Sequence, residues 1–283
     1  MSTTKADLAR VLAASQRDHA RGRARSQSGS PQAGKEFIAS LAKGLAVLGA
    51  FGEARPAMSL TEAANVTGLS RAAARRVLLT LAELGFVEQN GRDFTLAPRV
   101  LELGFGYLSV QSWIARAEPV MKELTAEFQE QCSAATLQGS DIVFVARIPA
   151  PSWIMSPTLP VGTRLPAFHT SLGRILLGHL EEAEIWQRLK ANPVVPHTPA
   201  TITDPRALVE RIQADREQGF SLVDEELERD LRSLAVAIVT RSGSAVGAIN
   251  LVAHAARTTR NEMRERFLPR LRAAADKVSE ALV

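Results

Sequence analysis

The first third of the chain has the hydrophobic spacing of short helices. In residues 37–51, with Ser40 as the expected N-cap, one helical face carries Leu41, Leu45, Leu48 and Phe51. A second helix is expected to begin after Ser59, because Glu62 follows three residues later as in a capping box, and to end at Gly68. A third helix is expected from Ser70 to about Leu84, where Gly85 follows.

The third helix has an apolar side and a basic side. Its buried stripe is expected to hold Ala74, Val77, Leu78, Leu81 and Leu84. Its exposed side is expected to hold Arg71, Ala72, Arg75, Arg76 and Thr80. Two β-prone runs then flank Asn90-Gly91, which is the strongest short hairpin signal in a sequence. Three short helices and a hairpin predict a winged helix-turn-helix over residues 35–97.

Residues 98–113 are expected to form one further helix. Its apolar residues are spread around much of the circumference, namely Val100, Leu101, Leu103, Leu108 and Val110. A helix of this kind needs more than one neighbour, so we expect a linker or dimerising helix.

Residues 114–283 alternate between helices and antiparallel hairpins. The hairpins are expected around Gly139-Ser140-Asp141 and Ser242-Gly243-Ser244, and the segment up to Cys132 is expected to be helical. Helices are expected on one side of the sheet. The predicted fold class is therefore α+β, with an N-terminal winged helix-turn-helix, a linker helix, and a sensor-like domain with an antiparallel sheet and flanking helices.

The net charge of +4 is concentrated at the N-terminus. Residues 1–34 hold six Lys and Arg against two Asp, whereas residues 35–111 hold eight against seven acidic residues. The end of this first segment is rich in Ser, Gln, Gly and Arg, so we expect a basic disordered arm. Its charge alone leaves two roles open, attraction to a polyanion such as nucleic acid, or solubility.

Several classes of protein find no support in the sequence. The one cysteine, Cys132, excludes a disulfide framework. No apolar run has the length of a membrane span and the N-terminus lacks a signal-peptide core, so a cytoplasmic protein without membrane contact is expected. The five histidines are scattered and match no metal-binding or catalytic motif. We expect no metal, no cofactor and no enzymatic activity.

The basic side of the third helix has the chemistry of a DNA-reading surface. A major groove about 12 Å wide admits a helix whose backbone can approach closely, and arginine can bind a guanine edge or a phosphate. The alternative is an ordinary solvated face, but the preceding helix, the Gly68 turn and the hairpin favour DNA. The expected DNA-binding residues are Ser59, Ser70, Arg71, Ala72, Arg75, Arg76 and Thr80, with Gln89, Asn90 and Arg92 at the tip of the wing.

Residues 36–275 resemble the IclR family of transcriptional regulators. The segments "SLAKGLAVLGAF", "LTEAANVTGLSRAAARRVLLTLAELGFVEQ" and "LAPRVLELGFGYLS" match its DNA-binding half and linker, and "VARIP", "VGTRLPAFHTSLGRILL" and "GAINL" match its second half. The resemblance implies a GAF-like domain that binds a small organic effector. These sequence segments are similar to those of the branch of the family that governs aromatic-acid breakdown. Members of that branch respond to protocatechuate, 4-hydroxybenzoate, catechol-pathway acids or β-ketoadipate.

The resemblance also implies the partners and the effector site. The partners would be operator DNA, a small organic acid and further copies of the chain, as a dimer or a dimer of dimers, with RNA polymerase as another candidate. The pocket-lining positions would be Ser171, Leu172, Val223, Ser233, Asn250 and Val252. Many relatives have an acidic residue where Val223 stands, so the polar pattern of their pockets does not transfer directly.

Other residues near these segments have suitable chemistry. Thr170 or Ser171 begins a helix whose N-terminus suits a carboxylate. His169 is a candidate polar partner, Trp153 and Met155 are candidate covers for an aromatic ring, and Arg147 or Arg164 is a candidate counter-ion. Ordinary packing or hydrogen bonding is the alternative for each. The acidic run Asp224, Glu225 and Glu226 is expected to be a solvent-facing loop.

Two further functions remain open from the sequence. One is an IclR-type regulator of a pathway for a short aliphatic keto or hydroxy acid. The other is a constitutive DNA-binding protein without an effector, against which the polar positions of the pocket segments argue. In the expected mechanism, an effector shifts the populations of two arrangements of the linker helix and so changes the spacing of two DNA-reading heads.

Overall fold

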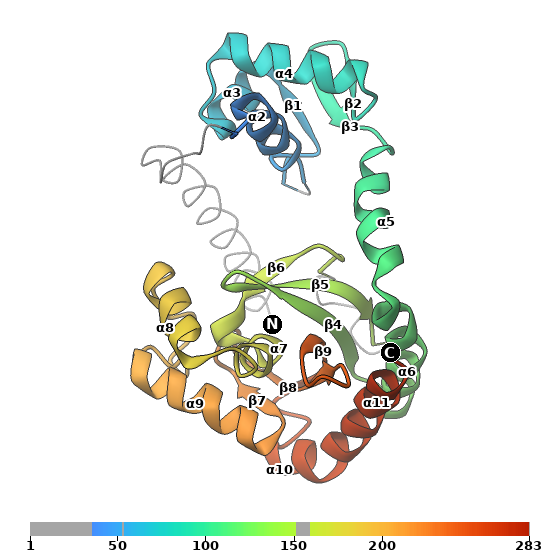
Figure 1. Cartoon of the computed structure of the whole chain (residues 1–283), viewed down its shortest axis with the longest axis vertical. Coiled ribbons are helices and arrows are strands. Elements are labelled where there is room, and N and C mark those ends of the chain that lie inside the picture. The colour runs from blue at the N-terminus through green and yellow to red at the C-terminus, as the bar shows by residue number, and fades with distance from the viewer. Residues whose placement is uncertain (1–35, 53, 151–158, 283) are drawn as a thin grey trace. The chain divides into compact units, whose positions relative to one another are not determined.

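The computed structural model describes residues 36–52, 54–150 and 159–282 (Figure 1). The chain divides into two compact units, with the boundary between Val110 and Gln111. The expected basic arm, residues 1–34, lies outside the described residues, as do Trp153 and Met155. Among the helices in the described ranges, none is long and apolar enough to cross a bilayer.

The N-terminal unit is a winged helix-turn-helix. Its helices are α2 (Ala39–Leu48), α3 (Leu60–Thr67) and α4 (Arg71–Glu83). Its antiparallel sheet has the order β1-β3-β2, formed by β1 (Ala57–Ser59), β2 (Val87–Asn90) and β3 (Asp93–Leu96). The core between helices and sheet contains Val47, Met58, Ala63, Leu78, Leu81 and Phe94. The predicted fold of this part is therefore confirmed.

Local capping fixes the turn between α3 and α4. The Ser59 hydroxyl accepts a hydrogen bond from the Glu62 backbone N–H, and the Glu62 carboxylate accepts one from the Ser59 N–H at 2.8 Å, which completes the predicted capping box. Gly68 ends α3 in the left-handed region with φ of 68°, which favours glycine. The Ser70 hydroxyl then caps α4 by accepting from the Ala73 N–H at 3.2 Å. Gly68 and Ser70 therefore define the turn that leads from α3 into the basic helix α4.

Three local predictions for this unit are wrong. Ile38, not Ser40, occupies the N-cap of α2, so Ser40 lies inside the helix. Leu84 is not in the buried stripe, because α4 ends before it and its side chain is about half exposed. The two-residue hairpin turn is Gly91-Arg92, since Asn90 still pairs with Asp93; Gly91 has φ of 64°, as suits a glycine at the first turn position.

The linker helix α5 (Val100–Val110) has no buried residue. Its exposed apolar side chains include Leu101, Leu103, Phe105 and Val110. The helix is shorter than the predicted segment 98–113, because Gln111 leaves the helical conformation with φ of −88° and ψ of 79° before α6 begins at Ser112.

The C-terminal unit is built on a six-stranded antiparallel sheet of order β6-β5-β4-β9-β8-β7. The strands are β4 (Gln131–Gln138), β5 (Asp141–Ile148), β6 (Arg164–Pro166), β7 (Ser221–Asp224), β8 (Leu231–Val239) and β9 (Ala245–His254). The central strands are the two predicted hairpins, β4–β5 and β8–β9. Cys132 lies in β4 rather than in a helix, because α6 ends at Phe128; burial raises the pKa of its thiol.

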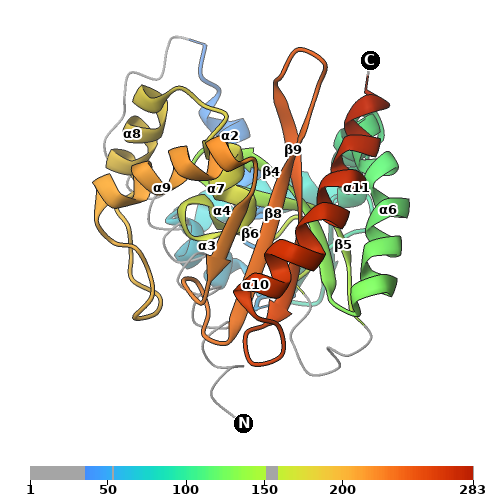
Figure 2. The ribbon, with the colours of Figure 1, turned by 90° about the horizontal axis from the view of Figure 1, so that it is seen from below.

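Helices cover both faces of this sheet, not one face as expected (Figure 2). One layer contains α6 (Ser112–Phe128) and α11 (Leu268–Glu280). The other contains α7 (Ser171–Leu177), α8 (Glu182–Ala191) and α9 (Pro205–Gln218). The predicted closing helix is present: α10 (Arg260–Glu262) continues through a π-helical turn, Met263–Phe267, into α11, close to Pro269, which has no N–H to donate.

Two glycines allow unusually close packing on opposite faces of the sheet. A Cβ added at Gly173 in α7 would lie 2.1 Å from the Ala167 carbonyl oxygen, so α7 packs directly on the turn before it. A Cβ added at Gly247 in β9 would lie 2.3 Å from the ring of Trp113 at the start of α6. Neither position has room for a larger residue.

Candidate functional site

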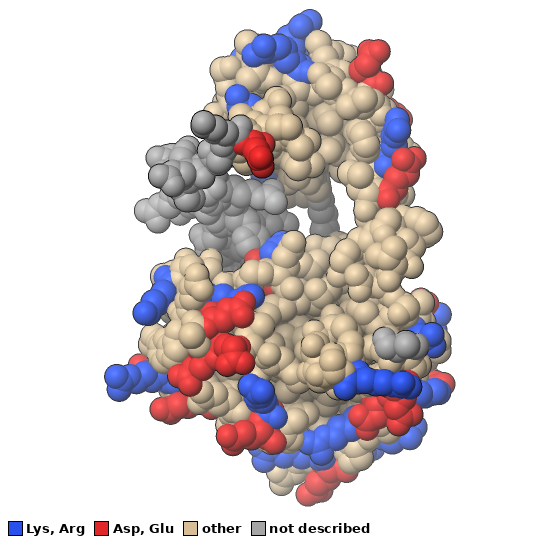
Figure 3. All heavy atoms as spheres, viewed as in Figure 1, with Lys and Arg blue, Asp and Glu red and all other residues tan. Residues whose placement is uncertain are grey.

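The exposed face of α4 carries the basic residues that the sequence indicated. The side chains of Arg71, Ala72, Arg75, Arg76 and Thr80 are all exposed. Within the described residues, no carboxylate forms an ion pair with the three arginines. Figure 3 shows Lys and Arg side chains gathered over this region, at the top of the view. The surface is basic, and among the described residues its arginines have no carboxylate partner, which suits a polyanion.

The hairpin β2–β3 extends beside this helix as a wing. At its tip, the Gln89 side-chain amide donates to the Gly91 carbonyl at 3.0 Å, while Arg92 is exposed. At its base, Arg99 donates to the Leu84 carbonyl at 2.7 Å and lies over the Phe86 ring. The wing is thereby fixed to the end of α4, although contact of any of these residues with DNA stays a prediction.

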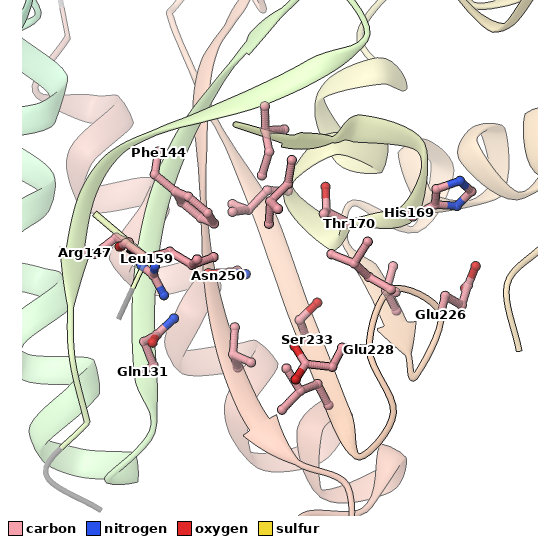
Figure 4. Close-up of a pocket in the computed structure, with 17 residues that line it drawn as sticks. Gln131, Phe144, Arg147, Leu159, His169, Thr170, Glu226, Glu228, Ser233 and Asn250 are labelled. Carbon is pink, nitrogen blue, oxygen red and sulfur yellow. Dashed lines mark hydrogen bonds between the residues drawn. The ribbon is translucent and has the colours of Figure 1, made fainter. Parts of the chain in front are cut away.

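The C-terminal unit contains a cavity between one end of the sheet and the α7 layer (Figure 4). It encloses about 740 Å³, including open space at its mouth. The apolar wall includes Ile142, Phe144, Leu159, Leu165, Leu172, Val223 and Leu231. The polar lining comes from Gln131, Arg147, His169, Thr170, Glu226, Glu228, Ser233 and Asn250. A mostly apolar cavity with a few polar groups is the usual form of a small-molecule site.

The structure gathers most of the sequence-predicted effector residues around this one cavity. Those that line it are Arg147, His169, Thr170, Leu172, Val223, Ser233, Asn250 and Val252. Ser171 is fully buried next to the lining, where its oxygen accepts a hydrogen bond from the Ser233 hydroxyl at 2.8 Å. Trp153 and Met155 fall outside the described residues. Contact of each residue with an effector stays a prediction.

Three buried polar atoms along the lining lack a hydrogen-bond partner. They are Nε of Arg147, Nδ1 of His169 and Oδ1 of Asn250. A buried polar atom without a partner costs about 1–3 kcal/mol, so such atoms are rare except where another molecule supplies the bond. All three residues line the same cavity, which suits a ligand with polar substituents.

Arg147 and Arg164 are differently engaged. Arg164 donates to Asp141 at 3.1 Å and to the Gln138 side chain, and it does not line the cavity. Arg147 lies over the Phe144 ring, donates to the Leu159 carbonyl, and has no carboxylate partner among the described residues. Burial lowers the pKa of Arg147 to about 10, so it stays charged at neutral pH. Of the two predicted counter-ions, only Arg147 is available to an anion in the cavity.

The acidic run after β7 is not the solvent-facing loop that we expected. Glu226 is buried and forms a two-pronged ion pair with Arg174, whose side chain is 0% exposed. Arg174 also donates from Nε to the Phe168 carbonyl at 2.8 Å, and the Thr201 hydroxyl donates to the Glu226 carbonyl at 2.7 Å. Asp224 is bound by Arg232 and Arg260. Glu226 therefore forms part of the cavity wall, and Asp224 is held by ion pairs rather than lying in a loose loop.

His169 is held as a neutral imidazole. Burial lowers its pKa to about 3, with smaller contributions from His197 and Arg174. The His197 ring meets it edge-on at 5.3 Å between centroids. His169 therefore contributes hydrogen bonding rather than charge at neutral pH.

The expected anion role of the helix N-terminus is weakened by the structure. The Thr170 hydroxyl already accepts a hydrogen bond from the Gly173 N–H at 3.1 Å, so one free donor is occupied. The helix α7 is also only seven residues long. A full positive charge on Arg147 is the stronger attractor for a carboxylate.

Sequence reasoning missed several lining residues, chiefly Gln131, Phe144, Leu227, Glu228 and Leu231. The period-two spacing of Ile142 and Phe144 in β5 could have placed them together on one face of a strand. The acidic residues gave no such signal, because Glu226 is buried by pairing with Arg174, 52 residues earlier.

A winged helix-turn-helix joined to a unit with a small-molecule cavity defines a ligand-responsive transcriptional regulator. Two family models match the chain, the IclR helix-turn-helix domain over residues 40–91 and the bacterial transcriptional regulator IclR C-terminal domain over residues 105–280. The protein belongs to the IclR family.

Its relatives include regulators of aromatic-acid metabolism. The chain is 41% identical to the Pca regulon regulatory protein of Pseudomonas putida, over 84% of this chain and 82% of that one. It is 34% identical to the p-hydroxybenzoate hydroxylase transcriptional activator of Acinetobacter baylyi, over 86% and 92%. A putative transcriptional regulator from Rhodococcus sp. RHA1 has a similar solved structure, with a TM-score of 0.77, 41% identity, and coverage of 87% and 98%.

Proposed function

We propose that this regulator responds to a small aromatic acid whose carboxylate pairs with Arg147 in the cavity. The main support for the proposal is Arg147, because it is a partly buried cation beside an aromatic ring and its Nε has no hydrogen-bond partner. The surrounding apolar wall suits a ring, and Asn250 and His169 offer polar contacts. A relative that activates the p-hydroxybenzoate hydroxylase gene supports an aromatic ligand.

The first experiment is fluorescence anisotropy with DNA from upstream of this gene and its neighbours. It is performed at two salt concentrations, with and without hydroxybenzoates, dicarboxylic acids and short keto acids. Selective DNA binding that one aromatic acid changes would support the proposal. A response to aliphatic keto acids alone would favour the alternative effector class, and indifference to every acid would favour a constitutive DNA-binding protein.

On the DNA side, we propose that two copies of the chain place two α4 helices in successive major grooves of a near-palindromic site. The exposed arginines of α4 support this role, as does the wing beside them. The exposed apolar side chains of α5 and of Leu41 and Leu45 in α2 would be covered by the second copy. An effector would then change operator binding by shifting the relative populations of two arrangements of the linker helix. The protein acts in this proposal without catalysis.

Arg75→Ala is expected to weaken specific operator binding by roughly 1–3 kcal/mol, because it removes a base or phosphate contact. Effector affinity should not change, since Arg75 is exposed on α4 in the other unit. Anisotropy titrations measure the first quantity and calorimetry the second. Arg229→Ala, an exposed arginine in the C-terminal unit, is the control. Normal operator binding by Arg75→Ala would show that α4 does not read DNA.

Arg147→Gln is expected to weaken effector binding by about 1.5–3 kcal/mol, because it removes a charged hydrogen-bond donor from a partly buried site. DNA binding without effector should stay as in the parent protein. The matched control is Arg164→Gln, because Arg164 is committed to Asp141 and Gln138. Equal losses in both variants, measured by calorimetry, would contradict the assignment of Arg147.

A further inference from the structure

The net positive charge of the protein lies outside its two described units. Residues 36–110 contain seven Lys and Arg against seven Asp and Glu, so the formal net charge of this segment is zero. Residues 111–283 contain twenty against twenty-one, which gives −1. The basic arm, together with Lys35, contains seven against two, which gives +5. Because DNA attracts proteins at long range through net charge, most of this attraction comes from the arm.

The wing is poorly suited to a minor groove. Glu88 and Asp93 are exposed on the hairpin β2–β3, whose one cation is Arg92, so the hairpin has a net charge of −1. The Gln89 amide already donates to the Gly91 carbonyl at 3.0 Å. The minor groove has a negative potential that is strongest where A·T pairs make it narrow, and it attracts arginine. Helix α4 thus presents an unpaired basic face to a major groove, whereas the wing presents none to the minor groove.

One segment of the basic arm has the charge and the size that a minor groove requires. Residues 21–25, RGRAR, place Arg21, Arg23 and Arg25 two apart, with only a glycine and an alanine between them, and no acidic residue occurs over residues 19–35. In an extended backbone, side chains two apart share one face at a spacing of about 6.6 Å, close to the ~6.8 Å of two base-pair steps. A strand whose other face holds only a glycine and an alanine is thin enough for a groove about 6 Å wide.

The chain between this segment and the DNA-binding unit is long enough to reach the neighbouring groove. Glu36, where the described unit begins, follows Arg25 by eleven residues, and α2 begins three residues later. Eleven residues span up to about 36 Å when extended. Neighbouring major and minor grooves are about 17 Å apart, half of a helical turn of DNA. The intervening residues, SQSGSPQAG, have the composition of a linker.

We propose that residues 21–25 bind in the minor groove of an A·T-rich segment next to the major groove that α4 reads. The inference rests on the proposed DNA binding by α4. The guanidinium groups would donate to the N3 and O2 acceptors that A·T pairs expose in this groove, whereas the N2 amino group of guanine would obstruct them. The arm would thereby add a base preference outside the bases that α4 contacts, beyond its non-specific attraction to phosphates.

Hydroxyl-radical footprinting locates this contact on the upstream DNA fragment that the anisotropy experiment identifies. We expect the full chain to protect about five base pairs beside the segment that α4 contacts, which is the length of RGRAR when extended. The triple variant Arg21→Gln/Arg23→Gln/Arg25→Gln should lose this protection. The matched control is Lys5→Gln/Arg10→Gln/Arg17→Gln, which removes the same charge from other positions of the arm and should keep the protection.

Base substitutions in the protected segment determine which groove is read. An inosine·cytosine pair has the major-groove pattern of G·C but lacks the N2 amino group in the minor groove. In anisotropy titrations, the full chain should bind duplexes with A·T or inosine·cytosine pairs there roughly tenfold more tightly than a duplex with G·C pairs. The triple variant should bind all three duplexes alike, and its slope of log K against log salt should be shallower by about 2–3 for each copy bound. The control should keep the preference.

The outcomes separate this inference from the proposed function. Equal binding of the G·C and inosine·cytosine duplexes, or a preference that persists in the triple variant, would overturn the minor-groove contact and leave DNA reading by α4 standing. Equal losses in the triple variant and the control would show that the arm acts through its total charge, and would overturn the assignment to residues 21–25. If the parent protein binds no upstream fragment selectively, both this inference and the proposed operator binding fall.

Discussion

Arg174→Met is expected to lower the free energy of unfolding of the C-terminal unit by about 3–5 kcal/mol. The Arg174 side chain is fully buried, and it satisfies both carboxylate oxygens of Glu226. Without it, Glu226 would keep a buried charge with only the Ile202 N–H, at 3.4 Å, as a direct donor to the carboxylate in the described structure. The Phe168 carbonyl would also lose its donor.

Urea denaturation, followed by circular dichroism, measures this loss. Arg216→Met, at an exposed position of α9, is the control and should change stability by less than about 0.5 kcal/mol. The double variant Arg174→Met/Glu226→Leu should recover most of the loss, because two apolar side chains leave no unpaired charge. A single variant as stable as the parent protein would show that the ion pair does not hold the cavity wall.

The double variant Leu101→Asp/Phe105→Asp is expected to prevent formation of the proposed dimer and to weaken operator binding by roughly 100-fold or more. The two side chains are 74% and 71% exposed on α5, a helix without a single buried residue. Two charges would make burial of that helix against a second copy unfavourable. One DNA-reading head alone would then lose the gain in effective concentration that a linked second head provides.

Analytical ultracentrifugation reports the oligomeric state and anisotropy the operator affinity. Val195→Asp changes another exposed apolar residue, 51% exposed in the C-terminal unit, and should leave both quantities unchanged. Effector binding should persist in both variants, since neither position lines the cavity. A protein that stays dimeric with two aspartates on α5 would exclude this helix from the interface.

Local signals predicted the N-terminal unit well. The capping residues Ser59 and Ser70, the glycine at 68 and the 3.6-residue spacing of α4 all act within one or two turns, so a reading of neighbouring residues suffices. The three-residue strands β1 and β6 were missed, because strands of this length show no alternation of their own and form only against a partner. Pro166 at the end of β6 gives a further signal against a strand.

The effector cavity could be predicted only where the family resemblance reached. The resemblance placed Ser233, Asn250 and Val252, which lie on two paired central strands. Of the acidic residues in the cavity wall, Glu226 was predicted to be exposed to solvent and Glu228 was not predicted at all. Glu226 is buried through its ion pair with Arg174 in a different element, and pairing between distant elements leaves no trace in the local spacing of residues.

Strand β9 runs from the cavity to the residues that follow the linker helix. Asn250 lines the cavity, and Gly247, three residues earlier, lies under the Trp113 ring with no space for even a methyl group. Side chains three apart on a strand point to opposite faces, so Asn250 faces the cavity while Gly247 faces the Trp113 ring. The ring cannot absorb a displacement of the strand by compressing a void, because the contact contains none. Trp113 follows Gln111, the break after α5, by two residues. An effector that shifts β9 is therefore expected to displace Trp113 and the first residues after the linker helix. A substitution that opens a gap at Trp113 is expected to reduce the response to the effector while leaving effector binding and DNA binding intact.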